Sequence, residues 1–332
     1  MKNRIYKALV VEEVADNVFT KQIRDCELDE LSAGDVIVQV AYSSLNYKDA
    51  LSASGNKGVT REYPHTPGID AAGIVAESAT DAVKEGEHVI VSGYDLGMNT
   101  AGGFGQYIRV PAGWVVKLPP GLSMKESMIF GTAGFTAGMS VDRITDMIKP
   151  EDGEILVTGS TGGVGSIAAA LLSKLGYAVV AVSGKEDAKA FLTKLGAREI
   201  ISRKAFTEGL DRPLLKARWA AVVDTVGGNI LATAVKSTRP RGLVACCGNV
   251  SSPELPLTVF PFILRGVTLA GIDSQNCPMA LRKRIWKRLA AEWKIAALDE
   301  IYREVALDAL PDEIEKILKG QQKGRVVVNL DL

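Results

Sequence analysis

Short apolar runs, interrupted by turn-forming residues, make up the first part of the chain, to about residue 120. Runs such as DVIVQVAYSSL, AAGIVAES, EHVIVSGY and GQYIRVPAGWVVKLP are separated by Gly, Pro, Asn and Asp. Short runs bounded in this way are typical of β-strands. The pattern therefore predicts a β-rich module in this region.

From about Ser123 the apolar residues adopt helical spacing, and strands then alternate with helices. The run SMKESMIFGTAGFTAGMSVDRI predicts a helix, with Ser123 as the N-cap and Glu126 three residues later, the spacing of a capping box. The strand-like runs that follow, among them EILVTG, AVVAVSG, AAVVDTVGG and GLVACCG, are apolar on both sides of the pleat. Such strands belong to a parallel sheet covered by helices on both faces, so we predict a doubly wound α/β unit.

The last part of the chain mixes both patterns. A helix is expected from about Pro278 to Lys294, followed by a further helix between two short strands in residues 301–332. We expect this tail to fold back on the first module. The chain has 332 residues, 47% of them hydrophobic, which is more than one compact core usually holds and favours two domains.

The charge balance argues against a nucleic-acid partner. Lys plus Arg and Asp plus Glu both count 39, so the formal net charge is zero, whereas affinity for nucleic acid depends on a basic excess. No window approaches the roughly 18 uninterrupted apolar residues that cross a bilayer, and the N-terminal residues lack the apolar core of a signal peptide. We therefore expect a cytoplasmic protein without a membrane partner.

The four cysteines do not indicate a metal site or a disulfide framework. Cys26, Cys246, Cys247 and Cys277 form no CxxC pair and no cluster with histidine at metal-ligand spacing. Reduced thiols in a cytoplasmic protein are the simplest interpretation.

A glycine-rich segment, VTGSTGGVGSIAAALLSKLG at residues 157–176, lies between an apolar strand and a helix. Its glycines depart from the usual G-x-G-x-x-G spacing, and a glycine turn by itself needs no ligand. The context matters more, because backbone N–H groups and the helix dipole favour an anion at a helix N-terminus. Dinucleotide binding is therefore favoured over a purely structural turn.

The end of the next strand bears on which dinucleotide binds. NAD enzymes place an acidic residue there against the ribose 2′-hydroxyl, but this chain has Ser183, Gly184 and Lys185. A lysine and a hydroxyl suit a 2′-phosphate, which favours NADPH. NAD stays the alternative, because two acidic residues follow in SGKED and a predicted strand can end a few residues later. Arg203, after the third strand, would close over the adenosine phosphate or be a lone surface arginine.

The motifs SSLNYKDAL, PGIDAAG, GTAGFTAG, TGGVG, DTVGG and PFILRG…GIDS occur in this order. With them the chain resembles the medium-chain dehydrogenase/reductase superfamily over nearly its whole length, and most of all its branch of quinone oxidoreductases and NADPH-dependent acrylyl-CoA reductases. The resemblance implies a GroES-like catalytic domain at residues 1–124, completed by residues 276–332, and a Rossmann domain at residues 125–275. It also implies a substrate cleft between the two domains.

The same resemblance bears on metal use. Zinc-dependent members supply catalytic ligands from a cysteine and a GHE sequence, where this chain has Asn46 and GID, with Asp70 in place of the glutamate. His65 and His88 fit no ligand pattern. We therefore expect no metal, and an acceptor already activated by conjugation, such as an α,β-unsaturated thioester, an enone or a quinone. NADPH would deliver hydride to the β-carbon of this acceptor.

The resemblance further implies the site residues. It places Tyr47 beside the nicotinamide, with Asn46 next to it, and these two are the candidate catalytic residues; the alternative for Tyr47 is an aromatic side chain packed at the domain junction. Asp70 is expected to be a structural hydrogen-bond acceptor. Besides Tyr47, the cofactor contacts are expected at Thr161, Gly162, Gly163, Val164, Gly165, Ser183, Gly184, Lys185, Arg203, Asn249, Ile263 and Ser274.

RGVTLAGIDS resembles the edge strand that pairs between subunits in this superfamily, which implies a homodimer; an unpaired apolar edge would be a liability. The favoured function is a zinc-independent reduction of an activated carbon-carbon double bond by NADPH, with a short acyl-CoA such as acrylyl-CoA as the acceptor. An NADPH-dependent quinone oxidoreductase is the alternative. A nucleotide-binding protein without catalysis is a third hypothesis.

Overall fold

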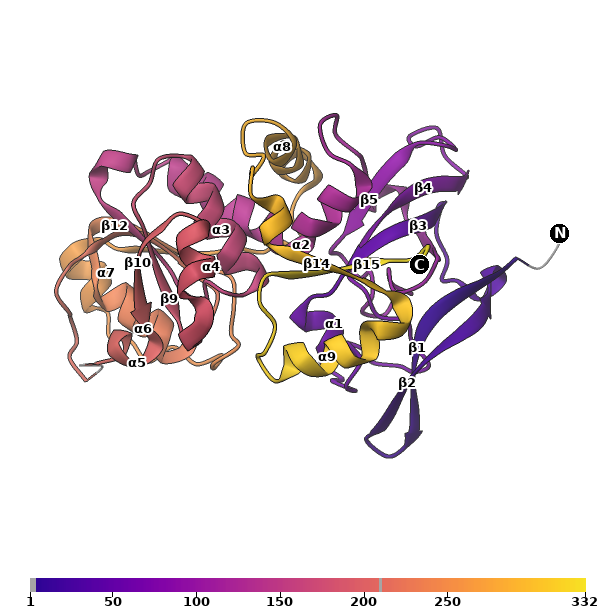
Figure 1. Cartoon of the computed structure of the whole chain (residues 1–332), viewed down its shortest axis with the longest axis horizontal. Coiled ribbons are helices and arrows are strands. Elements are labelled where there is room, and N and C mark those ends of the chain that lie inside the picture. The colour runs from indigo at the N-terminus through magenta and orange to yellow at the C-terminus, as the bar shows by residue number, and fades with distance from the viewer. Residues whose placement is uncertain (1–3, 209–210) are drawn as a thin grey trace. The chain divides into compact units, whose positions relative to one another are not determined.

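The computed structural model describes residues 4–208 and 211–332 and divides the chain into two compact units. Unit 1 runs to Thr132 and also contains Gln275–Ala291 and Leu298–Leu332, whereas unit 2 contains Ala133–Ser274 and Glu292–Ala297. Each unit is built on a sheet with helices packed on it (Figure 1). The division after Thr132 falls inside a helix and later than the predicted boundary after residue 124.

Unit 1 contains a seven-stranded sheet among its described residues, in the order β14-β15-β3-β4-β5-β7, with β6 paired to β3. The strands are β3 Val36–Ser44, β4 Asp70–Ser78, β5 His88–Ser92, β6 Tyr107–Val110, β7 Val115–Lys117, β14 Tyr302–Ala306 and β15 Arg325–Asn329. A hairpin of β1 Ile5–Ala15 and β2 Val18–Glu27 forms a separate two-stranded sheet. The β-rich module is therefore confirmed, and so is the return of the tail, because β15 pairs antiparallel with β3.

The α-helices α1 Tyr47–Ser52, α8 Met279–Ala290 and α9 Leu310–Leu318 lie wholly within unit 1. α8 and α9 confirm the helices expected in the tail, although α8 ends four residues before the predicted Lys294, at Ala290. α1 was not predicted, because its six residues are too few for a helical period. Figure 1 shows α9 beside α1, and Leu310 and Ile314 share one buried cluster with Ala50 and Ala53.

Unit 2 contains a six-stranded sheet in the order β10-β9-β8-β11-β12-β13 within the described part of the chain. The strands are β8 Glu154–Val157, β9 Val179–Ser183, β10 Ala197–Ser202, β11 Trp219–Asp224, β12 Thr238–Cys246 and β13 Thr268–Gly271. All five neighbouring pairs are parallel, and every residue of β9 and β11 is buried. This is the strand order of a Rossmann fold, which confirms the predicted doubly wound sheet.

The remaining helices are α2 Met124–Thr145, α3 Gly163–Lys174, α4 Lys189–Lys194, α5 Arg203–Phe206, α6 Gly228–Lys236 and α7 Phe260–Arg265. The predicted capping box at the start of α2 is confirmed: the Ser123 N–H donates to Glu126 Oε2 (2.8 Å), and the Glu126 N–H donates to Ser123 Oγ (3.1 Å). α2 is interrupted at Gly131, which has φ 50° and ψ −157°. This break was not predicted, since GTAGFTAG fits a continuous helix.

Candidate active site

A buried carboxylate, that of Asp70 at the start of β4, organises the polar cluster of unit 1. Thr132 donates to it from both its backbone N–H (2.9 and 2.8 Å) and its hydroxyl (2.7 Å). Ser44 Oγ (2.7 Å) and Asn46 Nδ2 (2.8 Å) donate to its second oxygen. Asp70 is therefore a hydrogen-bond acceptor, as expected, and both its oxygens are engaged.

The positive charge of this cluster comes from Arg325, the first residue of β15, whose side chain is 2% exposed. Its guanidinium donates to two backbone carbonyl oxygens (3.1 Å each), to Asn46 Oδ1 (3.1 Å) and to Ser44 Oγ (2.7 Å). Nη2 lies 3.8 Å from Asp70 Oδ2. Burial holds the pKa of Arg325 below its ordinary value, although the Asp70 and Asp49 carboxylates oppose that effect. An unpaired arginine could not stay buried here, so the ion pair is part of the fold.

The N-terminus of α1 carries the two candidate catalytic residues. Asn46 is the N-cap, and its backbone N–H donates to Asp49 Oδ2 (2.7 Å), while the Ile69 N–H donates to Asp49 Oδ1 (2.8 Å). Tyr47, the first residue of α1, is half-buried. Burial, followed by the charge of Asp70, raises the pKa of Asp49 to about 7. The backbone on both sides of Tyr47 is thus fixed by buried polar contacts.

The glycine-rich loop of unit 2 joins β8 to the N-terminus of α3. Gly159 has φ 57°, and a Cβ there would collide with Thr225 Oγ1. A Cβ on Gly165 would lie 2.7 Å from Ser160 Cα. Glycine is therefore required at both positions, and the tight loop leaves the first N–H groups of α3 as donors for an anion. Thr161 is buried in this loop, whereas Gly162, Gly163 and Val164 are half-buried.

Asp224, at the end of β11, ties this loop to the neighbouring strand. Its Oδ1 accepts from Thr158 Oγ1 (2.7 Å), and its Oδ2 accepts from the N–H groups of Val226 (3.2 Å) and Gly227 (2.8 Å). Thr225 closes the link through its hydroxyl, which donates to the Thr158 carbonyl (3.0 Å). Burial raises the pKa of Asp224. These contacts join β8 to β11 where the strand order reverses, the place at which open α/β sheets bind ligands.

The turn after β9 gathers the residues predicted to distinguish NADPH from NAD. Ser183 ends β9, and its Oγ accepts from the Lys185 N–H (3.0 Å). β10 ends beside it, with Ser202 paired to Ser183. A Cβ on Gly184 would lie 2.9 Å from Arg203 Cζ, so the Arg203 guanidinium lies against this turn. Two cationic side chains, Lys185 and Arg203, therefore flank one short segment.

The structure brings several predicted cofactor residues of unit 2 together. Ser160 in the glycine-rich loop donates from its hydroxyl to the Val182 carbonyl (2.8 Å), which places the loop next to the end of β9. A Cβ on Gly227 would lie 3.0 Å from the Cα of Asn249, so Asn249 lies beside the loop after β11. Ile263 is 68% exposed on α7, and Ser274 follows β13, so their cofactor roles rest on the resemblance alone.

Comparison with known proteins identifies the family. A model of the alcohol dehydrogenase GroES-like domain matches residues 32–120, and a model of the zinc-binding dehydrogenase matches residues 163–291. YhfP of Bacillus subtilis, provisionally named a quinone oxidoreductase, is 44% identical over 328 residues, 98% of this chain and 99% of YhfP. The acrylyl-CoA reductase AcuI of Ruegeria pomeroyi is 42% identical over 329 residues, 98% of this chain and 100% of AcuI. The chain belongs to the medium-chain dehydrogenase/reductase superfamily.

Two solved structures resemble the chain over nearly its whole length. The YhdH oxidoreductase of Salmonella enterica, crystallised with NADP, has a TM-score of 0.95 at 43% identity and covers 98% of this chain and 99% of its own. YhfP of Bacillus subtilis, crystallised with NAD bound, also scores 0.95 at 43% identity, over 98% of this chain and all of its own. In the part of the chain that the structure describes, no helix is long and apolar enough to cross a membrane.

Zinc, which gives one of the superfamily's domains its name, does not suit the residues of unit 1. Zinc sites use thiolate, imidazole and carboxylate ligands. Asp70 is the carboxylate at this position, and its oxygens already accept hydrogen bonds from Thr132, Ser44 and Asn46. The Arg325 guanidinium, 3.8 Å from Asp70, puts a permanent positive charge where a cation would bind. The side chains around Asp70 therefore do not fit a catalytic zinc ion.

Sequence reasoning missed three charged residues of these clusters. Asp49 and Asp224 lie inside motifs that were noted, LNYKDAL and DTVGG, but nothing local indicated that they would be buried acceptors. The role of Arg325 could not be read from its neighbours in sequence, because its partner Ser44 lies 281 positions earlier in the chain. The one local sign was an arginine directly before an apolar run, in RVVVNL.

Proposed function

We propose that the chain is a zinc-independent oxidoreductase that transfers hydride from NADPH to the activated double bond of a short α,β-unsaturated acyl-CoA. The choice of NADPH as cofactor rests on one observation. The glycine-rich loop lies next to the turn of Ser183, Gly184 and Lys185, and the Arg203 guanidinium lies against the same turn. The acceptor half is supported by AcuI, an acrylyl-CoA reductase that is 42% identical over 98% of this chain.

The charge of the adenosine end supports NADPH rather than NAD. A 2′-phosphate brings two further negative charges, and Lys185 and Arg203 offer compensating cations around the hydroxyl of Ser183. The YhdH complex with NADP supports the same choice. Because YhfP was crystallised with NAD bound, NAD is the alternative nucleotide, and binding of both nucleotides has to be measured. The pyrophosphate would be held by the N-terminal N–H groups of α3 with Thr161, Gly162, Gly163, Val164 and Gly165.

When bound, NADPH supplies the hydride. The chain's own residues then orient the acceptor and stabilise the charge that develops on its carbonyl oxygen. Tyr47 is proposed as the group that orients the acceptor or the nicotinamide. Asn46 is proposed as a positioning residue, because Arg325 and Asp70 engage both ends of its amide and leave it no free donor to aim at a substrate.

Turnover with a set of acceptors tests this proposal. Acrylyl-CoA should give a higher kcat/KM with NADPH than crotonyl-CoA or a quinone. A higher kcat/KM for the quinone would favour the alternative that the name of YhfP suggests, a quinone oxidoreductase. Binding of NADPH without turnover of any acceptor would leave the third hypothesis, a nucleotide-binding protein without catalysis.

A homodimer is proposed with this function. β13 is one of the two edge strands of the six-stranded sheet in unit 2, and α7, which precedes it in the chain, exposes large apolar side chains together with its N-cap. Val259 is 62% exposed, Ile263 68% and Leu264 64%. An apolar edge of this kind is normally covered by a partner.

The domain roles and the location complete the proposal. Unit 1 is proposed as the GroES-like catalytic domain and unit 2 as the Rossmann domain that binds NADPH. Cytoplasmic action is supported by the cysteines, since all four are free thiols in the structure.

A further inference from the structure

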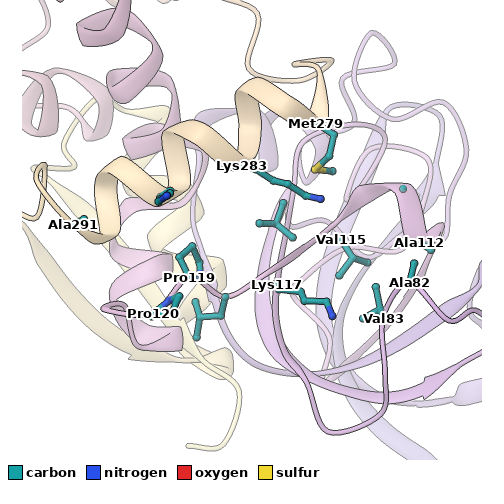
Figure 2. Close-up of a pocket in the computed structure, with 14 residues that line it drawn as sticks. Ala82, Val83, Ala112, Val115, Lys117, Pro119, Pro120, Met279, Lys283 and Ala291 are labelled. Carbon is teal, nitrogen blue, oxygen red and sulfur yellow. The ribbon is translucent and has the colours of Figure 1, made fainter.

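A groove of about 600 Å³ lies in unit 1, between α8 and the segment that contains β7 (Figure 2). On the α8 side it is lined by Met279, Lys283, Lys287 and Ala291. Met279, Lys283 and Lys287 are four residues apart, so they form one stripe along α8, and Ala291 follows directly after the end of the helix. Because a helix rises 1.5 Å per residue, the stripe from Met279 to Lys287 is about 12 Å long, and Ala291 extends it. The groove is therefore elongated, and its volume is in the range of small-molecule sites.

The wall opposite α8 is apolar. Val115 and Val116 of β7 contribute buried side chains, and Pro119 and Pro120 follow them along the wall (Figure 2). Proline has no backbone N–H, so this part of the wall offers no main-chain donor at those two positions. A surface of this composition favours contact with hydrocarbon.

The polar side chains that line the groove among the described residues are all cationic. Lys283 and Lys287 are exposed on α8, and neither makes a hydrogen bond or ion pair with any residue in the ranges 4–208 and 211–332. Lys117, on the β7 side, already pairs with Glu87 at 2.6 Å, and Glu87 does not line the groove. Among the described residues no carboxylate lines it. The groove thus holds two uncompensated positive charges, and their aliphatic stems add to its apolar surface.

We propose that this groove binds an amphipathic carboxylate, an extended hydrocarbon chain with a single anionic group, such as a free fatty acid. The carboxylate would accept hydrogen bonds from Lys283 and Lys287, and the chain would lie along the stripe of α8 against Val115, Val116 and the prolines. The elongated shape and the apolar wall favour a chain over a compact anion. None of the residues proposed to bind NADPH or the acceptor lines the groove, so this site is separate from the active site.

Calorimetric titration of the full chain tests this proposal, with decanoate as the probe. Decanol, which lacks the charge, and inorganic phosphate, which lacks the chain, separate the two contributions. The variant Lys283→Gln/Lys287→Gln removes both cations. Met279→Glu is a second variant: it places a carboxylate at the start of α8, one turn before Lys283, where it suits the helix dipole and competes inside the groove.

Lys7→Gln/Lys319→Gln is the matched control, since both lysines are exposed in unit 1 and neither lines the groove. Decanoate should bind the unmodified chain and this control equally. Its affinity should fall by about tenfold or more in the Lys283/Lys287 variant and in Met279→Glu, because a charge-assisted hydrogen bond contributes at least that factor. Decanol and phosphate should both bind more weakly than decanoate.

Several results would overturn the proposal. Absence of decanoate binding to the unmodified chain would remove the site. If decanoate bound both groove variants as tightly as it binds the unmodified chain, the two lysines would not be used for binding. Phosphate binding as tightly as decanoate would indicate a simple anion site, and decanol binding as tightly would indicate an uncharged apolar site.

Discussion

At the scale of single residues, the surroundings of a charged side chain determine its role. Lys185 and Arg203 lie around one short turn, whereas Arg325 is buried with Asp70 and makes five polar contacts. Lys185 and Arg203 were predicted from the sequence, because each follows a predicted strand. The ion pair of Arg325 with Asp70 was not, because a buried ion pair depends on segments far apart in the chain.

Lys185→Glu should weaken NADPH much more than NADH. The substitution replaces a cation by a carboxylate at the turn where the 2′-phosphate is proposed to bind, and a loss of about tenfold or more is expected from one charged hydrogen bond. Dissociation constants for both nucleotides measure this effect. Lys189→Glu, an exposed lysine at the start of α4, is the control. Equal losses for NADPH and NADH would mean that the turn does not recognise the 2′-phosphate.

Asp49 should make the stability of the protein depend on pH. Its pKa in the folded protein is raised to about 7 by burial and by Asp70, from an ordinary value of 3.8, so the folded state binds this proton more tightly than the unfolded state does. The resulting stabilisation is complete below the lower value and is lost as the pH rises through about 7.

The measurement is the free energy of unfolding in urea at about pH 5 and about pH 8 for the unmodified chain and for Asp49→Asn. From about pH 5 to about pH 8, the free energy of unfolding of the unmodified chain should fall by roughly 1–4 kcal/mol more than that of Asp49→Asn. Asp81→Asn, an exposed site in the same unit, should show a constant difference. A constant difference for Asp49→Asn as well would contradict the assigned pKa.

At the scale of elements, many helices and strands could be predicted from the sequence, since each carries its own period and boundary signal. The capping box of Ser123 and Glu126 is an example, because both partners lie within four residues. The break in α2 was not predictable, because it depends on Asp70 and Ser44, which meet Gly131 only in the folded unit. α1 was not predicted either, because it is too short to show a hydrophobic period. It is held instead by Asp49, whose carboxylate accepts hydrogen bonds from the N–H groups of Asn46 and Ile69.

Gly131→Ala should destabilise the protein by about 2–4 kcal/mol, because φ is positive and the added Cβ would lie 2.6 Å from Asp70 Oδ2. Unfolding in urea measures the effect. Gly113→Ala is the control, since a Cβ there meets no atom within 4 Å. A loss no larger than that of the control would show that the helix break is not required.

At the scale of the whole molecule, the order of a β-rich module, a doubly wound unit and a returning tail was predictable from the change in hydrophobic period. The functional site was predictable only in part. The glycine-rich loop and the SGK turn are local in sequence, whereas the cluster of Asp70, Asn46 and Arg325 joins three distant segments. The acceptor came from the resemblance, because no local pattern encodes it.

The proposed dimer makes a prediction at the same scale. Leu264→Glu places a charge on the exposed apolar surface of α7, where Leu264 is 64% exposed in the single chain. Light scattering after size exclusion should show a dimer for the unmodified chain and a shift toward monomer for this variant. Ile5→Glu, at a side chain that is 65% exposed in β1, should leave the dimer intact. A monomeric unmodified chain would contradict the dimer.

Transfer of a hydride from NADPH to a carbon-carbon double bond can be followed in the product itself. In a single turnover, the enzyme receives NADPH with deuterium at the transferable C4 position and acrylyl-CoA as the acceptor, and the product is analysed by mass spectrometry. We expect propionyl-CoA with one deuterium on the β-carbon, the α-carbon having taken its proton from a side chain or water. Unchanged acrylyl-CoA beside a quinone that the same enzyme reduces readily would contradict this expectation.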